Sequence, residues 1–318
     1  MNLLTRLGVF ALAIFAVLSA GNVATLVATE RRAPSTTAHS IVNPSYKRER
    51  LPDGRWKSET YAFGKGSLID RSGRDDSLSA LSFEEICRIL AVALAQENYV
   101  PTPDVESTDL VIVVSWGKTV PYDDGVKGLS LDGMSTAMSS LGRIRGDVAL
   151  RSEMDGNAAS PTAAESSQMS SLESEMDSML MMQAMSDRAR RQADDYNARL
   201  LGYAPALADA YSTLPIGPQR TLLDDLVAEI ETPRYFVILQ AYDFRKMWKE
   251  KKRELLWMTR FSIRAKGRRF DEELADMASA ASTLFGADSG KLKRRLHPGR
   301  GEMGELEVVG IEEEPDGE

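Results

Sequence analysis

The stretch that decides the fold is RYFVILQAYDFRKMWKEKKRELLWMTRFSIRA, residues 234–265. Its first part is unbroken apolar sequence from Tyr235 to Leu239, which predicts a central strand buried on both faces. Its last part alternates between apolar and polar residues, and this period of two predicts a half-buried strand with four apolar residues on one side: Leu255, Trp257, Phe261 and Ile263. The polar run between them predicts the turn of a β-hairpin.

The same stretch carries an unusual concentration of positive charge. Between Arg245 and Arg269, eleven Lys or Arg residues stand against Glu250 and Glu254, a local net charge of +9. One interpretation is a solvated edge that resists aggregation, and the alternative is a surface for an anionic partner such as a polymer or a lipid surface. The candidate contact residues are Arg245, Lys246, Lys249, Lys251, Lys252, Arg260 and Arg264.

Four segments around the hairpin have patterns that predict regular structure. Ser82 and Glu85 form the S-x-x-E capping box in front of an apolar run of helical period, which predicts a helix with Cys87 on its buried face. Residues 109–117, DLVIVVSWG, predict another strand buried on both faces. Residues 270–286 begin with acidic residues and end at Gly286, as expected of a helix. Residues 55–69 predict a strand that ends in a turn at its glycines.

The middle of the chain has a different character. Residues 121–168 are rich in Gly, Ser, Asp and Ala, and we expect a loop or a partly disordered segment. The following residues up to Leu200 predict a long amphipathic helix, and its methionines form either plain core or an adaptable groove for a partner. Residues 221–231 predict one more helix, which ends before Pro233.

The N-terminus predicts a secretory signal peptide over residues 1–28. Arg6 supplies a positive charge, the run from Leu7 to Leu18 is apolar, and small residues follow it. This apolar core is shorter than the ~20 residues of a membrane-spanning helix. Extended through Ala28 it reaches that length, so an N-terminal membrane anchor remains the alternative.

The segments next to the two termini predict little packed structure. Residues 29–54 contain Pro, Ser and Thr without an apolar period, which indicates a flexible tether. Residues 301–318 hold eight acidic residues and no basic ones, which predicts an acidic tail. Such a tail could screen the basic hairpin until an anionic partner displaces it.

Composition limits the chemistry. The chain has 318 residues with a net charge of −8, which argues against general nucleic-acid binding. One cysteine and two histidines leave no disulfide framework and little material for a His-based metal site or triad. Ser115 and Lys118 have the S-x-x-K spacing of penicillin-binding enzymes, but they follow a predicted strand, and we interpret them as the end of that strand. No cofactor motif is present in the sequence, and we expect no cofactor.

Several short motifs resemble those of uncharacterised bacterial envelope proteins, which join a signal peptide to a small α+β domain and are often lipoproteins. The motifs are YAF at Tyr61, ENY at Tyr99, DLVIV at Asp109 and LLW at Trp257. The resemblance covers about residues 55–119 and 234–290 and implies a fold and an envelope location, without an activity. The chain departs from the lipoprotein members because no cysteine lies near the cleavage region.

These observations together predict an α+β fold, with a two-layer antiparallel or mixed sheet packed with helices. The domain is predicted to be discontinuous, over 55–119 and 233–300, with a loop and helical insertion at 120–232. The expected function is that of a non-catalytic exported protein, periplasmic or in the cell envelope, that acts through protein partners. The alternatives are an anion-binding module that uses residues 245–269, and an enzyme whose acid and base groups are carboxylates and lysines.

Overall fold

The computed structural model describes residues 35–70, 73, 75–122, 125–155, 158–212 and 217–296. The predicted signal peptide and the predicted acidic tail lie outside these residues, so both stay predictions. No helix in the described part of the chain combines the length and the apolar character that crossing a membrane requires.

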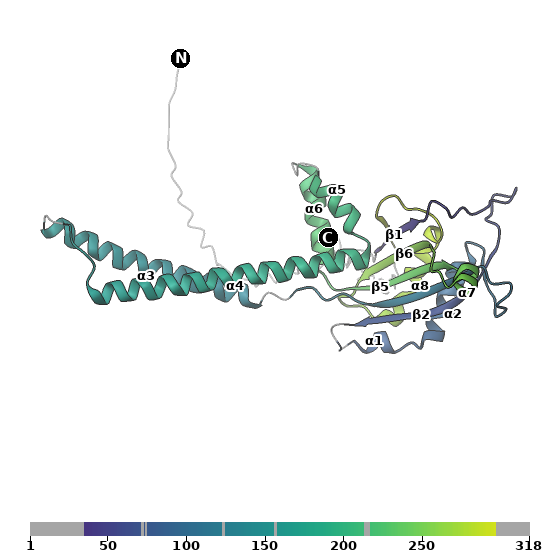
Figure 1. Cartoon of the computed structure of the whole chain (residues 1–318), viewed down its shortest axis with the longest axis horizontal. Coiled ribbons are helices and arrows are strands. Elements are labelled where there is room, and N and C mark those ends of the chain that lie inside the picture. Colours follow the sequence, from purple (N-terminus) through teal and green to yellow (C-terminus); the bar gives the residue numbers. More distant parts are fainter. Residues whose placement is uncertain are drawn as a thin grey trace, which may run out of the picture. The chain divides into compact units, whose positions relative to one another are not determined.

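A mixed β-sheet forms the centre of the fold (Figure 1). The strand β2 (Glu59–Asp70) runs parallel to both of its neighbours, β3 (Tyr99–Pro101) and β4 (Leu110–Lys118), and all other neighbouring pairs are antiparallel. The predicted α+β class is therefore confirmed, and so is the predicted hairpin pairing of β5 (Arg234–Asp243) with β6 (Leu255–Arg264). Within the described ranges the sheet has seven strands, in the spatial order β3 (Tyr99–Pro101), β2 (Glu59–Asp70), β4 (Leu110–Lys118), β5 (Arg234–Asp243), β6 (Leu255–Arg264), β1 (Ser35–Val42) and β7 (Lys293–Leu296).

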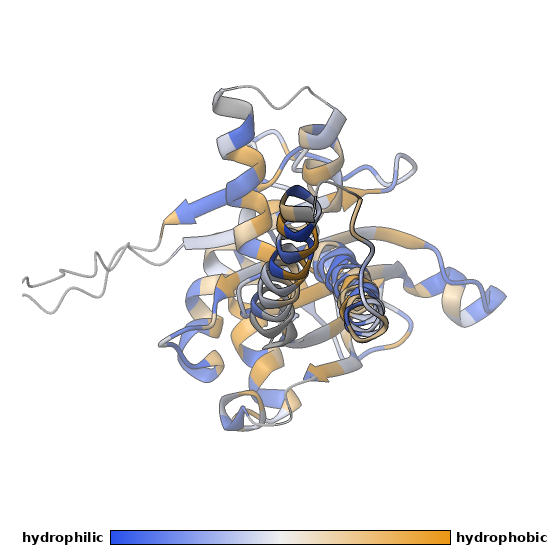
Figure 2. Ribbon diagram, turned by 90° about the vertical axis from the view of Figure 1, so that its left-hand side faces the viewer, coloured by the Kyte–Doolittle hydropathy of each residue, from blue (hydrophilic) through white to orange (hydrophobic). Residues whose placement is uncertain are grey.

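Helices cover both faces of this sheet, and Figure 2 shows hydrophobic strands between them. Along β5, Tyr235, Val237 and Leu239 point into one core, whereas Phe236 and Ile238 point into the other. The first core is closed by α1 (Asp76–Ser79), α2 (Phe83–Ala95), α8 (Phe270–Ala281) and the 3-10 turn Ser282–Leu284. The second is closed by the C-terminal end of α4 (Ala163–Leu201), by α5 (Ala204–Ser212) and by α6 (Pro218–Ile230).

Two predictions about local packing are confirmed. Ser82 and Glu85 form the capping box at the start of α2, with both reciprocal hydrogen bonds present. Trp257 is fully buried and lies between the rings of Phe285 and Tyr99, with centroid distances of 6.1 and 5.7 Å. The hairpin aromatics therefore face the core, as the alternation along β6 predicted. Cys87 is only half-buried, beside that core.

The prediction of a flexible tether over 29–54 is wrong for residues 35–42, because they form β1 between β6 and β7. The strand has no apolar period because hydroxyl side chains, those of Thr36, Thr37 and Ser40, occupy three of its five buried positions. The hydroxyls of Ser40 and Thr259 lie 2.8 Å apart, and the Thr37 hydroxyl accepts a hydrogen bond from the Arg234 guanidinium at 3.2 Å. A buried hydroxyl costs little when it is hydrogen-bonded.

The turn predicted at the glycines of residues 55–69 is also wrong, because Gly64 and Gly66 lie inside β2. The pairing of β2 with β4 shifts register just after Lys65. A Cβ atom at Gly66 would overlap the Ser115 hydroxyl and lie 2.6 Å from the Val114 carbonyl oxygen. The glycine is required by the close approach of β4, and it does not end the strand.

The loop predicted within 121–168 is wrong for most of its length, because α3 (Gly125–Asp155) fills it. α3 lies antiparallel to α4, and Ala137, Leu141 and Ile144 are buried in the contact (Figure 1). Arg145 and Arg151 form ion pairs across it to α4, with N–O distances of 3.3 and 2.6 Å. Glycines and serines give α3 weak intrinsic helix propensity, so tertiary contact stabilises this helix.

The helical segment leaves the sheet and returns to it at one place. Thr119 follows β4, and its N–H donates to the carbonyl of Arg234 at the start of β5, at 2.9 Å. The Asn197 side-chain amide of α4 donates to the carbonyls of Val120 and Ile230, at 3.2 and 3.3 Å. The two ends of the segment are therefore joined to the sheet and to each other.

Candidate functional site

The connection between β5 and β6 was predicted as a polar turn, and it contains a short helix, α7 (Phe244–Glu250). Asp243 caps this helix, because its carboxylate accepts a hydrogen bond from the Lys246 N–H at 2.9 Å. Lys251 ends it in the left-handed conformation, with φ of 57°. The hairpin itself is present, but the turn is helical because a capping carboxylate precedes a run of good helix formers.

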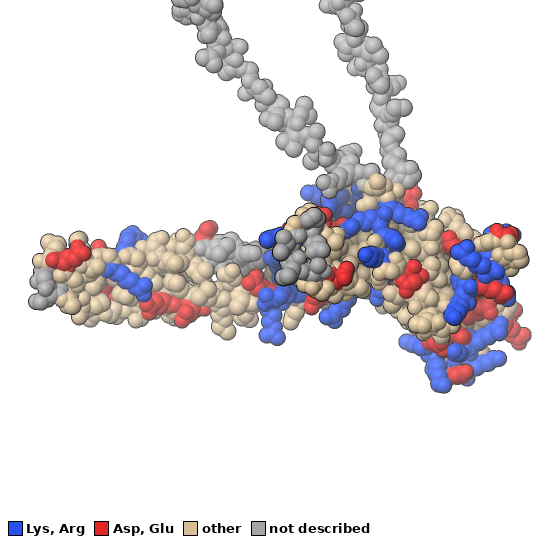
Figure 3. All heavy atoms as spheres, turned by 90° about the horizontal axis from the view of Figure 1, so that it is seen from above, with Lys and Arg blue, Asp and Glu red and all other residues tan. Residues whose placement is uncertain are grey.

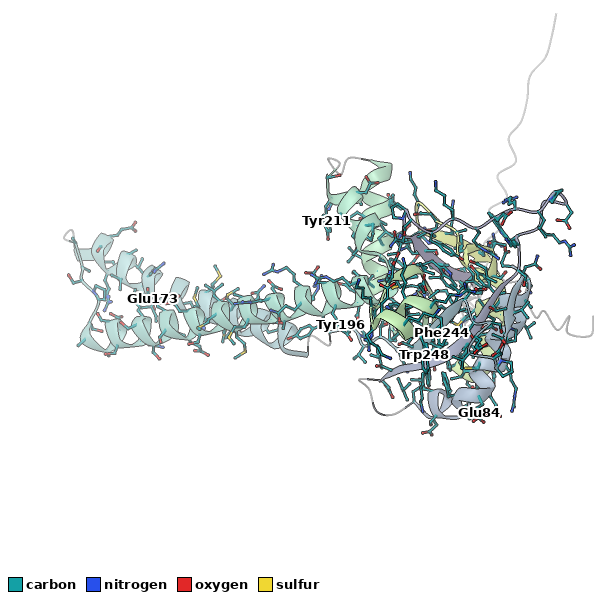
Figure 4. All side chains as sticks on the ribbon, turned by 45° about the vertical axis from the view of Figure 1, so that its right-hand side comes forward. Glu84, Glu173, Tyr196, Tyr211, Phe244 and Trp248 are labelled. Carbon is teal, nitrogen blue, oxygen red and sulfur yellow. The ribbon has the colours of Figure 1, made fainter. Side chains whose placement is uncertain are left out.

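An exposed aromatic pair dominates α7. Trp248 is 59% exposed and stacks on Phe244, with a centroid distance of 6.0 Å and an angle of 15° between the rings (Figure 4). The Lys251 ammonium lies 5.3 Å from the centroid of the Trp248 ring. An indole left in water forgoes about 2 kcal/mol or more of burial free energy. An exposed tryptophan among cations therefore indicates a contact surface.

The α7 surface, as we call it, consists of Phe244, Arg245, Trp248, Lys249, Lys251, Lys252 and Arg253 together with Val105 and Glu106 of the neighbouring loop. A hollow of about 430 Å³ lies between α7 and that loop, lined by Val105, Glu106, Phe244, Arg245, Trp248 and Lys249. Figure 3 shows lysine and arginine atoms interspersed with carboxylates on the side of the molecule that carries α7. The surface is therefore both basic and partly apolar.

Part of the positive charge is neutralised locally. Arg245 pairs with Asp109 at 3.2 Å, Lys246 pairs with Glu254 at 2.5 Å, and Lys252 lies 3.4 Å from Glu250. Within the part of the chain that the structure describes, Lys249, Lys251 and Arg253 form no ion pair. These three cations are available to an anionic ligand, and two of them, Lys249 and Lys251, adjoin Trp248 in sequence or in space.

Four of the seven predicted contact residues belong to the α7 surface: Arg245, Lys249, Lys251 and Lys252. Lys246 also lies in α7, but it lines a different hollow, where it pairs with Glu254. The prediction is wrong for Arg260, which is half-buried beside His39 beneath Gly202 at the end of α4. Burial lowers the pKa of its guanidinium. Arg264 is exposed but lies at the other end of β6, opposite Arg234. Sequence reasoning missed Trp248 itself, although a tryptophan inside a polar run was a usable signal.

Two other clusters bear on the alternative of a carboxylate and lysine enzyme. At the first, Asp75 caps α1 and accepts hydrogen bonds from Lys118 and Tyr235, each at 2.7 Å, beside a cavity of about 540 Å³. Burial alone would raise the pKa of Asp75, but hydrogen bonds from Lys118, Ser77 and Tyr235 outweigh it and lower the pKa to about 2. Burial also raises the pKa of Tyr235 to about 12. At neutral pH Asp75 is therefore ionised and Tyr235 keeps its proton, and the hydrogen bond between them fixes the positions of both side chains.

Ser115 and Lys118 both lie in β4, so their interpretation as part of a strand is confirmed. Lys118 is bonded to Asp75, whereas the Ser115 hydroxyl accepts a hydrogen bond from the Ser67 N–H at 3.2 Å. The S-x-x-K spacing thus reflects strand packing.

The second cluster borders a cavity of about 510 Å³ between the loop 43–58 and the sheet. Tyr46 donates to Glu59 at 2.5 Å, and the Arg48 Nε lies 3.0 Å from the same carboxylate. Burial raises the pKa of Glu59 above its usual value. The Arg48 guanidinium also lies 4.2 Å from the centroid of the Tyr99 ring. These contacts fasten the loop to β2 and β3.

In the described ranges, no three or more His, Cys, Asp or Glu side chains are grouped so that they could hold a metal ion. Comparison of the chain with models of protein families finds no match, and comparison with curated proteins finds none either. The resemblance to bacterial envelope proteins therefore stays an expectation based on short motifs.

Proposed function

We propose that the protein is a non-catalytic component of the bacterial envelope that acts by contact, and that the α7 surface binds anionic lipid headgroups. The observation that carries the proposal is the exposed Trp248, stacked on Phe244 and accompanied by cations that form no ion pair with any residue described. Tryptophan favours the boundary between water and hydrocarbon because its ring is amphipathic. Lysine and arginine beside it add attraction to anionic lipids, about 1 kcal/mol each.

The arrangement suits a lipid surface better than a single base or sugar. Phe244 and the Lys251 ammonium already lie against the Trp248 ring, so a flat ligand would have to displace one of them in order to stack. A headgroup layer needs only the exposed edge of the indole and the charges around it. The neighbouring Val105, also exposed, adds apolar area on the same side of the hollow.

The proposed envelope location rests on the predicted signal peptide. The expectation that the protein has protein partners in the envelope rests on that predicted location. The proposed absence of catalysis is supported by the Asp75 and Glu59 clusters, whose polar groups are used to fasten one element to another.

The test is vesicle binding by the full chain, extracted in a mild detergent and then mixed with vesicles of phosphatidylcholine, with or without phosphatidylglycerol. We expect stronger sedimentation with the anionic vesicles. Trp248→Ala should weaken this binding about tenfold, as expected for losing one interfacial aromatic residue. Lys249→Glu combined with Lys251→Glu should weaken it about 100-fold or more, because two cations are reversed.

The controls change the same residue types elsewhere. Tyr211→Ala removes an exposed aromatic side chain from α5 (Figure 4), and Lys293→Glu reverses an exposed charge on β7. Both control variants should bind the vesicles as the wild type does. Every variant keeps the apolar N-terminal sequence, so any binding that this sequence contributes is the same in all of them. Equal binding by wild type and the α7 variants would refute the proposal. Binding to heparin alone, lost in the α7 variants, would replace the lipid with an anionic polymer.

A further inference from the structure

On the outward face of α4, charged residues and methionines are ordered so that the face is complementary to a second, antiparallel copy of itself. Six residues spaced by three or four positions share this face, since such residues lie above one another on a helix: Glu173, Asp177, Met181, Met185, Arg188 and Arg191. All six are exposed, whereas Met176, Met179 and Ser186 on the other side are half-buried or buried. The face therefore runs from two acids through two methionines to two arginines.

The two methionines at its centre are the feature that calls for a partner. Met181 is 67% exposed and Met185 is 65% exposed, and Figure 2 shows hydrophobic residues on the long helices as well as on the sheet. The contact with α3 does not cover them. Methionine is a common residue at contact surfaces because its flexible thioether side chain adapts to the opposite surface.

We propose that two copies of the protein associate through this face of α4, with the two helices antiparallel about a two-fold axis near residues 182–183. In this register Asp177 of one copy lies opposite Arg188 of the other, and Glu173 lies opposite Arg191. Met181 lies opposite Met185 at the centre. Every contact occurs twice, as a two-fold interface requires.

The symmetry of the charges is the reason for choosing a second copy as the occupant. A different partner would need a complementary surface of its own, and nothing would then require α4 to be complementary to itself. Asp177 and Arg188 form no ion pair with any residue inside the described ranges, so both remain available. Glu173 forms an exposed pair with Arg145 at 3.3 Å, which is weak enough to be exchanged (Figure 4).

The paired segment from Glu173 to Arg191 is about 27 Å long. Acidic and basic ends of this kind fix the antiparallel direction and the register, while the methionines supply the buried area. The contact should therefore weaken as salt is raised. It is independent of the α7 surface, so either proposal can fail without the other.

The test is the mass of the full chain in mild detergent by sedimentation equilibrium, with charge exchange across the proposed axis. We expect the wild type to dimerise. Asp177→Arg places arginines opposite one another and should raise the dissociation constant about tenfold or more. Arg188→Asp should do the same. The double variant restores opposite charges in both pairs and should dimerise as the wild type does.

Glu175→Arg is the matched control, because it makes the same change of charge on an exposed position of α4 that does not share the outward face. It should leave the dissociation constant unchanged, and helix content by circular dichroism verifies that each variant is folded. A monomeric wild type would overturn the proposal. So would a dimer that tolerates both single exchanges, or a double variant that stays monomeric.

Discussion

Replacing Trp257 with alanine tests whether the hairpin aromatics form the core. The side chain is fully buried, so alanine loses the burial of on the order of 200 Å² of apolar surface. At ~25 cal/mol per Å², this loss lowers the free energy of unfolding by about 5 kcal/mol. One effect acts in the opposite direction. The indole Nε1 has no hydrogen-bond partner among the described residues, and the variant relieves that cost of about 1–3 kcal/mol. The two effects together give an expected net loss of about 2–4 kcal/mol, near the lower end of what is found for other buried aromatics.

The free energy of unfolding is measured by urea denaturation followed by far-ultraviolet circular dichroism. Trp257→Phe should cost less than about 1.5 kcal/mol, since it keeps the ring contacts with Phe285 and Tyr99 and removes the unpaired N–H. Trp248→Ala is the matched control, because that tryptophan is exposed on α7, and it should change stability by less than about 0.5 kcal/mol. Equal losses from the two alanine variants would refute the assignment of Trp257 to the core.

Two further predictions use the same denaturation assay. Gly117→Ala should destabilise the protein by more than about 2 kcal/mol, because a Cβ atom there overlaps the backbone of Ile69. Gly142→Ala in α3 should stabilise it by about 0.5–1 kcal/mol, because a Cβ atom there meets nothing within 4 Å. A destabilised Gly142→Ala would contradict the helical assignment. Asp75 has a lowered pKa of about 2, so its contribution is fully present above pH ~3.8 and is lost as the pH falls towards 2. Asp75→Asn should lower the free energy of unfolding by about 2 kcal/mol at pH 6 and flatten its dependence on pH between 4 and 2. An unchanged slope would contradict the lowered pKa of Asp75.

The elements that could be predicted from the sequence are those whose pattern and surroundings agree. β4 and β5 are buried on both faces, and both appear in the sequence as unbroken apolar runs. The capping box of α2 is a local signal that needs no tertiary context. In contrast, β1 was missed because most of its buried positions carry hydroxyls, and the sequence does not reveal that Thr259 and Arg234 lie beside the hydroxyls of Ser40 and Thr37 to form hydrogen bonds with them.

For the candidate site too, the sequence predicted what depends on local pattern and missed what depends on elements distant in sequence. The basic residues on α7 were predicted because they are contiguous in sequence, so any structure of that segment places them together. Arg260 was misplaced because alternation along β6 assigns it to the face opposite Trp257, and that face was expected to be open to solvent. The end of α4 covers it instead. Which face of a strand meets water depends on elements distant in sequence, and a period of two cannot report them.

The junction at Thr119 and Arg234 has a consequence for the order of folding. These residues are hydrogen-bonded although they lie 115 positions apart, so β5 leaves the ribosome long after β4. Closing so long a loop costs about 3 kcal/mol more than closing one of about four residues. Asn197 reduces this penalty if α4 and α6 pack first, because its amide then already holds Val120 and Ile230 together. An early helical intermediate would bring β4 and β5 close to each other. Asn197→Ala should therefore slow refolding more than it lowers the free energy of unfolding.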